Sequence, residues 1–147
     1  MILHIINGDC ALSGWKKADF QGEVLVWREN YLHGIIPETD DIVLFNRIRA
    51  AELHKFAPEK TEDDIFTELQ TMHSKLFALN KSDRLILWLD CCPFDTALKK
   101  RLLELVDLMP EMPEVQIIQQ DVIWDEAAFR KYRNYADASN DRYWDTE

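Results

Sequence analysis

The sequence predicts an α/β domain in three layers, built on a mainly parallel sheet of four strands. Four apolar runs carry this prediction, at residues 2–6, 23–27, 84–89 and 115–119. Each run is continuous rather than alternating, which is typical of strands that helices cover on both faces. Segments with helical periodicity separate the runs, and this alternation of strand and helix favours a parallel sheet.

Helical patterns fill the segments between the runs. Residues 11–18 predict one short helix, with Trp15 as its core contact. Two helices are expected between residues 37 and 80, and the second begins at a capping box that runs from Thr61 to Asp64. Residues of these two helices recur at helical spacing near one face: Ile42, Phe45, Arg49, Leu53 and Phe56 in the first, and Ile65, Leu69, Met72 and Leu76 in the second.

Two further helices complete the pattern. Pro93 lies where a proline is tolerated in a first helical turn, and the helix that it opens is expected to bury Leu98, Leu102 and Leu105. The last helix is expected over residues 125–135. With right-handed crossovers, these elements predict the strand order 2-1-3-4 of a small Rossmann-like or flavodoxin-like sheet.

The predicted domain spans residues 1–135. Residues 136–147 form an acidic C-terminal tail that contains the aromatic pair Tyr143 and Trp144. In a sheet of this order, ligands bind beyond the carboxyl ends of the strands, near the point where the strand order reverses. We therefore expect any ligand site there.

Composition disfavours several classes of partner. The chain has 27 acidic and 17 basic residues, a formal net charge of -10, whereas duplex nucleic acid and anionic membranes attract Lys and Arg. No stretch approaches the roughly 20 apolar residues of a membrane span. Three cysteines are an odd number, which argues against a disulfide framework. Together with the lack of a visible secretory signal, these features predict a cytoplasmic protein.

Polar residues follow each predicted strand and supply the candidate ligand site. Arg28 is suited to holding a phosphate or carboxylate through two parallel hydrogen bonds, although an ordinary ion pair is the alternative. His33 lies in a Gly- and Pro-containing loop that is long enough to fold over a site. The candidate ligand-binding residues are Asn7, Gly8, Asp9, Cys10, Arg28, Glu29, His33 and Asp90.

Asp9 and Asp90 follow adjacent strands in this topology. Two carboxylates so placed repel each other unless one is protonated or a cation lies between them. Mg²⁺ suits such an oxygen-rich pair, so Asp9 and Asp90 are the candidate metal ligands. The alternative is that each aspartate caps the helix that follows it, and the sequence leaves both interpretations open.

Standard cofactor motifs are missing from the sequence. Gly8 is a single glycine, so the first turn is no dinucleotide fingerprint, and no Gly-Lys-Ser or Gly-Lys-Thr phosphate loop occurs. Cys10 and Cys91 lie at predicted helix N-termini, where a thiol ionises more easily, but no spacing ties a base to either. His4 lies inside a predicted strand, which is typical of a packed core histidine.

Several stretches resemble a bacterial family catalogued only as a domain of unknown function (family 1835). They are HIINGD at residues 4–9, GEVLVWRE at 22–29, LHGIIP at 32–37 and LWLD at 87–90 with Phe94-Asp95. Family members begin with a similar His-hydrophobic-hydrophobic-x-Gly-Asp-Ser pattern, and the similarity extends over about residues 3–121. The resemblance supports the fold and Asp9 as a site residue, and it implies a bacterial source but no activity. Cys10 replaces the usual serine, Glu29 an aspartate, and Ile36 intervenes before the proline of the loop.

Two functions remain open from the sequence. The first is a small-molecule or nucleotide-type ligand site at the strand ends, with a divalent cation such as Mg²⁺ and with no reaction assigned. The second is a non-enzymatic interaction or regulatory module that binds a protein partner or a second copy of the chain through its acidic surface or its aromatic tail.

Overall fold

The computed structural model describes residues 1–137 and the backbone of residues 143–145. Contacts divide the chain into two compact units, Met1–Arg28 together with Leu79–Glu147, and Glu29–Ala78. The first unit holds the sheet, and the second unit holds the two helices that follow the second strand. No helix among the described residues is both long enough and apolar enough to cross a bilayer.

A parallel sheet forms the centre of the first unit. Its strands run in the order β2-β1-β3-β4-β5, so the four predicted strands have the predicted order, and every pairing is parallel. The strands are β1 (Ile2–Asn7), β2 (Glu23–Trp27), β3 (Arg84–Leu89), β4 (Glu114–Gln119) and β5 (Tyr143–Asp145).

The fifth strand is an addition to the predicted sheet. The sequence places Tyr143 and Trp144 in a polar tail, whereas the backbone there pairs with β4. Residues 138–142 and 146–147, and the side chains of this aromatic pair, lie outside the described part of the chain.

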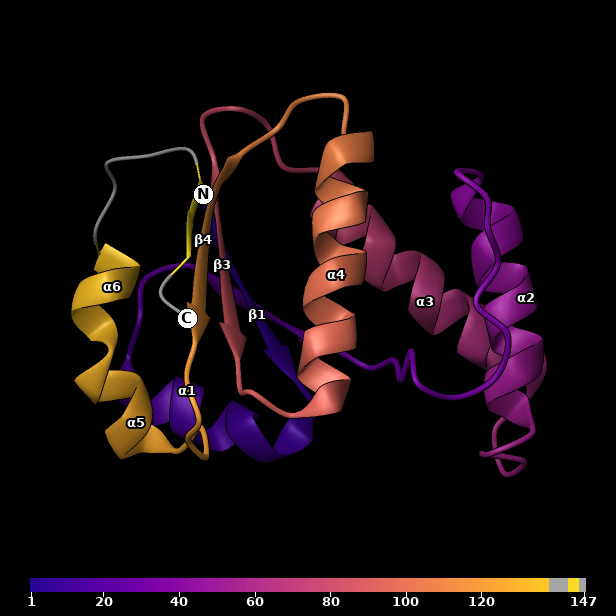
Figure 1. Ribbon diagram of the computed structural model, residues 1–147, viewed down its shortest axis with the longest axis horizontal. Coiled ribbons are helices and arrows are strands. Elements are labelled where there is room, and N and C mark those ends of the chain that lie inside the picture. Colours follow the sequence, from indigo (N-terminus) through magenta and orange to yellow (C-terminus); the bar gives the residue numbers. More distant parts are fainter. Residues whose placement is uncertain (138–142, 146–147) are drawn as a thin grey trace. The chain divides into compact units, whose positions relative to one another are not determined.

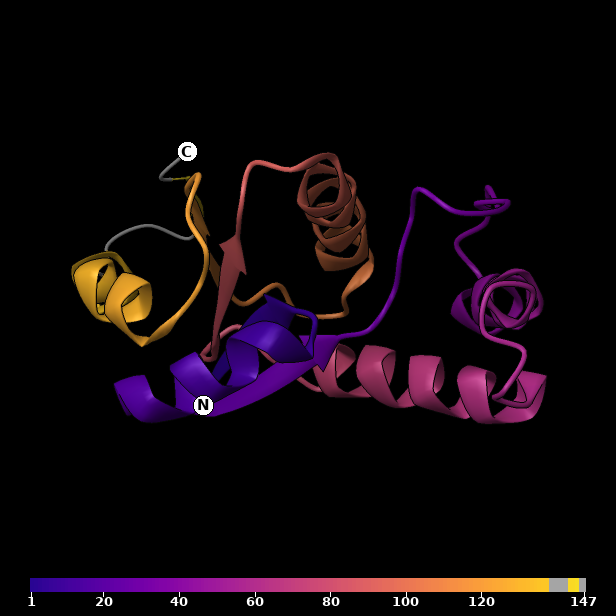
Figure 2. The same ribbon diagram turned by 90° about the horizontal axis from the view of Figure 1, so that it is seen from below.

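Helices cover both faces of the sheet and make the three-layer, Rossmann-like or flavodoxin-like fold. Figures 1 and 2 show α4 on one face and α5 and α6 on the other. α1 packs against α5 and therefore shares its face. The predicted last helix is broken in two at Tyr132, which has a non-helical backbone. The elements are η1 (Asp9–Ala11), α1 (Leu12–Ala18), α4 (Pro93–Leu108), α5 (Glu126–Lys131) and α6 (Arg133–Asp137).

Aromatic side chains fill the layer between the sheet and helices α1, α5 and α6. Trp88 of β3 lies edge-on to Trp124 and Phe129, with ring centroids 5.1 and 5.0 Å apart. Trp15 of α1 belongs to the same buried cluster, as predicted. Gly14 lets α1 approach α5, because a Cβ atom there would lie 2.8 Å from the backbone of Asp125. The core on this face therefore depends on large aromatic side chains and on a glycine at position 14.

His4 is a polar member of this aromatic layer. Its side chain is buried, as the sequence predicted for a core histidine. Trp88 Nε1 donates to His4 Nδ1 at 3.0 Å, so the other ring nitrogen, Nε2, carries the proton and donates to the Gln21 carbonyl at 2.9 Å. Burial lowers the pKa of His4 from 6.5 to about 4. The ring is therefore neutral at physiological pH, and both nitrogens are satisfied.

The second unit is a pair of packed helices, α2 (Ile42–His54) and α3 (Glu62–Phe77). Thr61 caps α3, since its hydroxyl accepts from the backbone N–H of Asp64 at 3.0 Å. The four apolar residues predicted to lie on one face of α3 are all buried. Phe56 is a correction: it follows the end of α2 and is 59% exposed, so it is no part of the helix's buried face.

A buried ion pair holds the loop that enters α2. The side chains of Arg49 and Glu29 are 0% and 1% exposed, and two guanidinium nitrogens donate to the carboxylate at 2.7 and 3.0 Å. The same guanidinium donates to the carbonyls of Asn30, His33 and Ile35 at 2.7 to 3.0 Å. One arginine thus satisfies the polar backbone of an irregular segment that has few regular hydrogen bonds of its own.

The neutral, buried state of His4 makes stability depend on pH. Because its folded pKa is lowered to about 4 from 6.5, the unfolded chain binds more protons between these values. We expect its contribution to the free energy of unfolding to be complete above pH 6.5 and to fall by up to about 3 kcal/mol as the pH drops towards 4. Urea denaturation of wild type and His4→Phe across this range measures the difference, and parallel pH profiles would contradict it.

The Arg49–Glu29 pair predicts a large effect of a single substitution. Arg49→Met leaves a buried carboxylate without its counter-charge, which costs about 3 to 5 kcal/mol of unfolding free energy. Arg47→Met on the same helix is the matched control: Arg47 forms an exposed pair with Asp63, and losing it costs about 1 kcal/mol or less. Urea denaturation followed by circular dichroism compares the two variants, and equal losses would show that the burial of the pair is immaterial.

Candidate functional site

Asp95 connects the ends of the two central strands. It lies in the first turn of α4 and is 3% exposed. One carboxylate oxygen accepts from the side-chain amide of Asn7, the last residue of β1. The other accepts from the backbone N–H of Asp90, directly after β3, at 2.7 Å. The strand order reverses between β1 and β3, so this carboxyl lies where the fold is expected to bind ligands.

The turn before α4 explains why the chain folds this way. Cys92 is the N-cap of the helix, and its sulfur accepts from the backbone N–H of Asp95 at 3.4 Å. Pro93 follows at the first helical position, as the sequence predicted. Asp90 Oδ1 accepts from the backbone N–H of Cys92 at 2.7 Å. The side chains of Asp90, Cys92 and Asp95 thus each bond to a backbone N–H of another member of the group.

Burial shifts the pKa values of two members of this cluster. Burial raises the pKa of the Asp95 carboxyl, and the negative charge of Asp90 raises this pKa further. The hydrogen bonds from the Asp90 backbone and from Asn7 lower the same pKa, but their effect is smaller. Burial also raises the pKa of the Cys92 thiol, and Asp90 adds to this effect. The thiol is therefore held in its protonated form, which is unsuitable for a nucleophile.

Three side chains of the cluster offer atoms to a single cation. One ligand atom each from Asp90, Cys92 and Asp95 lies within 4.8 Å of the others. Of the two predicted metal ligands, Asp90 belongs to this cluster and Asp9 does not; its other two members are Cys92 and Asp95. The change alters the chemistry, because Mg²⁺ takes oxygen ligands while a thiolate suits Zn²⁺ and similar metals.

Asp9 has a different neighbour from the one predicted. Arg28 Nη2 donates to Asp9 Oδ1 at 2.6 Å, and the side chains are 45% and 65% exposed. The helix-cap interpretation is wrong for both aspartates, since Gly8, Ala11 and Cys92 are the N-cap residues of η1, α1 and α4. Asp9 and Arg28 form an exposed ion pair where β1 and β2 end.

The remaining candidates are divided between the two units. Gly8 has a φ of +77° and open space around the position of a Cβ atom, so its role is to let the chain turn after β1. Cys10 follows it and is exposed. Glu29 and His33 belong to the second unit, where Glu29 is paired with Arg49 and the His33 ring lies 4.9 Å from that of Phe56. A shared ligand for residues of both units stays a prediction.

Asp95 and Cys92 are absent from the candidate site residues that the sequence predicted. Their signal was present, because Cys92-Pro93-Phe94-Asp95 places an acidic residue three positions after a helix N-cap. Gln119 was also missed: its amide donates to the Asp90 carbonyl at 3.0 Å and is itself held by Lys99 at 3.0 Å. These contacts join residues 20 to 88 positions apart, which no local pattern specifies.

Comparison of the chain with protein-family models, with curated proteins and with solved structures found no match. The functional argument therefore depends on the geometry of the chain itself.

Loss of the Asp95 carboxyl should destabilise the first unit. Asp95→Ala removes two hydrogen bonds to a carboxyl and leaves the Asn7 amide without that acceptor, at an expected cost of about 2 to 4 kcal/mol. Asp107→Ala, an exposed change on the same helix, should alter stability by about 0.5 kcal/mol or less. Urea denaturation of both variants tests this, and a loss confined to Asp107→Ala would refute the role given to Asp95.

Proposed function

We propose that the first unit binds a small anionic ligand, of the nucleotide or sugar-phosphate type, together with a divalent cation at the carboxyl ends of β1 and β3. The observation that carries the proposal is the cluster of Asp90, Cys92 and Asp95, whose ligand atoms lie within 4.8 Å of one another. It occupies the position where sheets of this strand order bind ligands.

A cation would relieve the electrostatic cost of the cluster. The negative charge of Asp90 contributes to raising the pKa values of both Asp95 and Cys92, so Asp90 disfavours the ionised forms of these two groups. A bound divalent ion reverses this preference, because it stabilises carboxylates and thiolate alike and releases the proton of the thiol. The sulfur ligand favours Zn²⁺, while the two carboxylates also accept Mg²⁺ or Mn²⁺.

Arg28 supports the anionic part of the proposal. Its guanidinium holds the exposed carboxylate of Asp9, and such a surface pair is worth about 1 kcal/mol or less. A phosphate group is a stronger partner for the same planar fork, so a ligand phosphate can compete with Asp9 for Arg28. No reaction is assigned to this site.

A protein-binding function is the second candidate, and one observation favours it. Large apolar side chains are exposed on the second unit, among them Ile35 at 63%, Val43 at 55% and Phe56 at 59%. Exposed apolar side chains are common at surfaces that bind other proteins, although scattered ones are also ordinary.

Metal titration tests the proposed function directly. We expect Zn²⁺ and Co²⁺ to raise the melting temperature of the full chain, with about 2.7 kcal/mol of stabilisation at a hundredfold excess over the dissociation constant. Co²⁺ should also show the charge-transfer absorption of a thiolate ligand, because Cys92 coordinates it. Asp90→Asn keeps the acceptor for the Cys92 N–H and should abolish both effects, whereas the exposed control Asp121→Asn should leave them intact.

The metal-loaded protein is then titrated with inorganic phosphate and with nucleoside mono-, di- and triphosphates. Arg28→Gln should weaken any binding that is seen. Failure of Zn²⁺, Co²⁺, Mg²⁺ and Mn²⁺ to stabilise the protein in a manner sensitive to Asp90 would overturn the proposal and favour the protein-binding function.

A further inference from the structure

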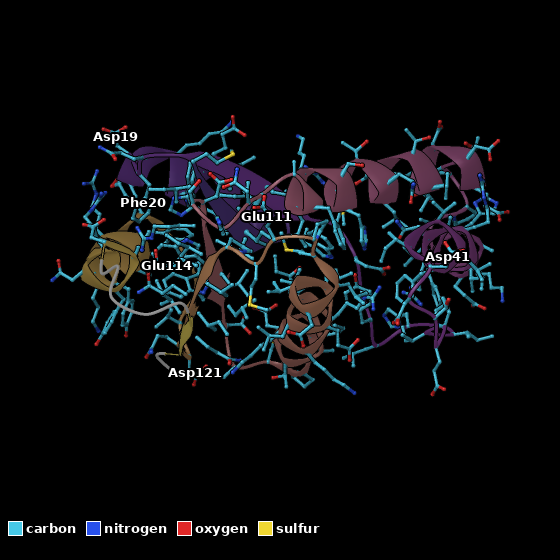
Figure 3. The ribbon with its side chains drawn as sticks, turned by 90° about the horizontal axis from the view of Figure 1, so that it is seen from above. Asp19, Phe20, Asp41, Glu111, Glu114 and Asp121 are labelled. Carbon is cyan, nitrogen blue, oxygen red and sulfur yellow. The ribbon has the colours of Figure 1, made fainter. Side chains whose placement is uncertain are left out.

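A cavity of about 470 Å³ lies at the opposite edge of the sheet, within the first unit. Ile2 and Arg84, the first residues of β1 and β3, line it together with His4 and Ile86 one row further in. Phe20 and Arg133 contribute from the turn after α1 and from α6. Figure 3 looks onto this edge, with Phe20 beside α6 and Glu114 at the start of β4. The volume is in the range of small-molecule sites.

Charges are unevenly distributed around the cavity. The half-buried ionic side chains of its lining are Arg84 and Arg133, whereas the acidic members, Asp19 and Asp137, are exposed. Exposed carboxylates are screened by water, while half-buried guanidinium groups are screened less. Arg84 is also paired with the half-buried Glu114, whose Oε2 lies 3.3 Å from Arg84 Nε. The excess positive charge of the inner cavity therefore comes from Arg133, although the chain as a whole has a formal net charge of -10.

Both arginines are held in place by backbone carbonyls at helix ends. Arg84 Nη2 donates to the Ala136 carbonyl at 2.7 Å and to Gln116 Oε1 at 3.1 Å. Arg133 Nη2 donates to the Ala18 carbonyl, and its guanidinium carbon lies 4.4 Å from the centre of the Phe20 ring. Each guanidinium has five N–H groups in a rigid fork, so fixing one nitrogen orients the others. The arginines are thus positioned before any ligand arrives.

The side-chain amide of Gln116 is a second, independent observation, because its N–H donors lack an acceptor among the described residues. It pairs in register with Ile86, which pairs with His4, so the three residues form one row on the sheet face beneath the cavity. The side chain is 3% exposed, and its Nε2 finds no hydrogen-bond partner among the described residues. A buried donor without an acceptor costs about 1 to 3 kcal/mol. An oxyanion that reached this row would accept from it.

We propose that this cavity is a second ligand site, which binds a small organic anion with a carboxylate or phosphate group attached to an apolar body. The oxyanion contacts Arg133 and Arg84, and the apolar body lies against Phe20, Ile2 and Ile86. The site is separate from the one at the carboxyl ends of the strands, because the two lie at opposite edges of the same sheet, so either can fail without the other.

The test uses four probes that separate the two parts of the ligand: acetate, benzoate, inorganic phosphate and phenyl phosphate. The readout is the indole N–H signal of Trp88 in the NMR spectrum of the full chain, since that group donates to His4, whose ring lines the cavity. We expect saturable shifts with benzoate or phenyl phosphate, and the better of these two identifies the oxyanion. Acetate and inorganic phosphate should bind at least about tenfold more weakly.

Matched arginine variants decide whether the cavity is the site. Arg133→Gln should weaken binding at least about tenfold. Arg130→Gln should not, since Arg130 is one turn away, donates to the Lys17 carbonyl and does not line the cavity. If Arg133→Gln fails to fold, Arg133→Lys keeps the charge without the fork and should weaken binding severalfold. The proposal would be overturned if the Arg130 and Arg133 variants had equal effects, or if no probe gave a saturable Trp88 shift. Equal affinity for acetate and benzoate would overturn the part of the proposal that assigns the ligand an apolar body.

Discussion

The buried carboxyl of Asp95 is the constraint on which the carboxyl edge of the sheet depends. A carboxyl that is 3% exposed must have hydrogen-bond donors, and here they come from the ends of β1 and β3. Satisfying it fixes Asn7 and the backbone of Asp90, and the same turn places the sulfur of Cys92 at the start of α4. The geometry of the proposed cation site is thus a consequence of how one side chain is kept hydrogen-bonded.

Side-chain hydrogen bonds also link the central strand β1 to β3, or to the turn just beyond it, on both faces of the sheet. Successive side chains of a strand point to opposite faces, so His4 and Asn7, three positions apart, enter different layers. On one face His4 accepts from Trp88 of β3, and on the other Asn7 donates to Asp95 just beyond β3. These two polar contacts add to the backbone pairing that already sets the register of β1 and β3.

The sequence predicted what local patterns encode. Continuous apolar runs identified β1 to β4 because strands covered on both faces need apolar side chains throughout, and proline and threonine marked the starts of α4 and α3. β5 was missed because three residues in a polar tail carry no such pattern. The sequence predicted the candidate site at the carboxyl edge of the sheet, but it did not predict Asp95 as part of it. The reason is that Asp95 and Asn7, which contact each other, are 88 positions apart in the chain. The sequence predicted that Arg49 lies near one face of its helix, but no local pattern predicted that it forms a buried ion pair with Glu29.

Parallel topology also explains why the two proposed sites differ in chemistry. Each helix that follows a strand begins at the carboxyl edge, where its partial positive charge favours carboxylates such as Asp90 and Asp95. The helices return to the amino edge, where their last carbonyls attract cations, and Arg84 and Arg133 donate to carbonyls at the ends of α6 and α1. An anion arriving at the cluster of Asp90, Cys92 and Asp95 needs a cation to mediate its binding, whereas an anion in the cavity meets the guanidinium group of Arg133 directly. The two proposed sites therefore differ in chemistry because the helices of a parallel sheet all point the same way.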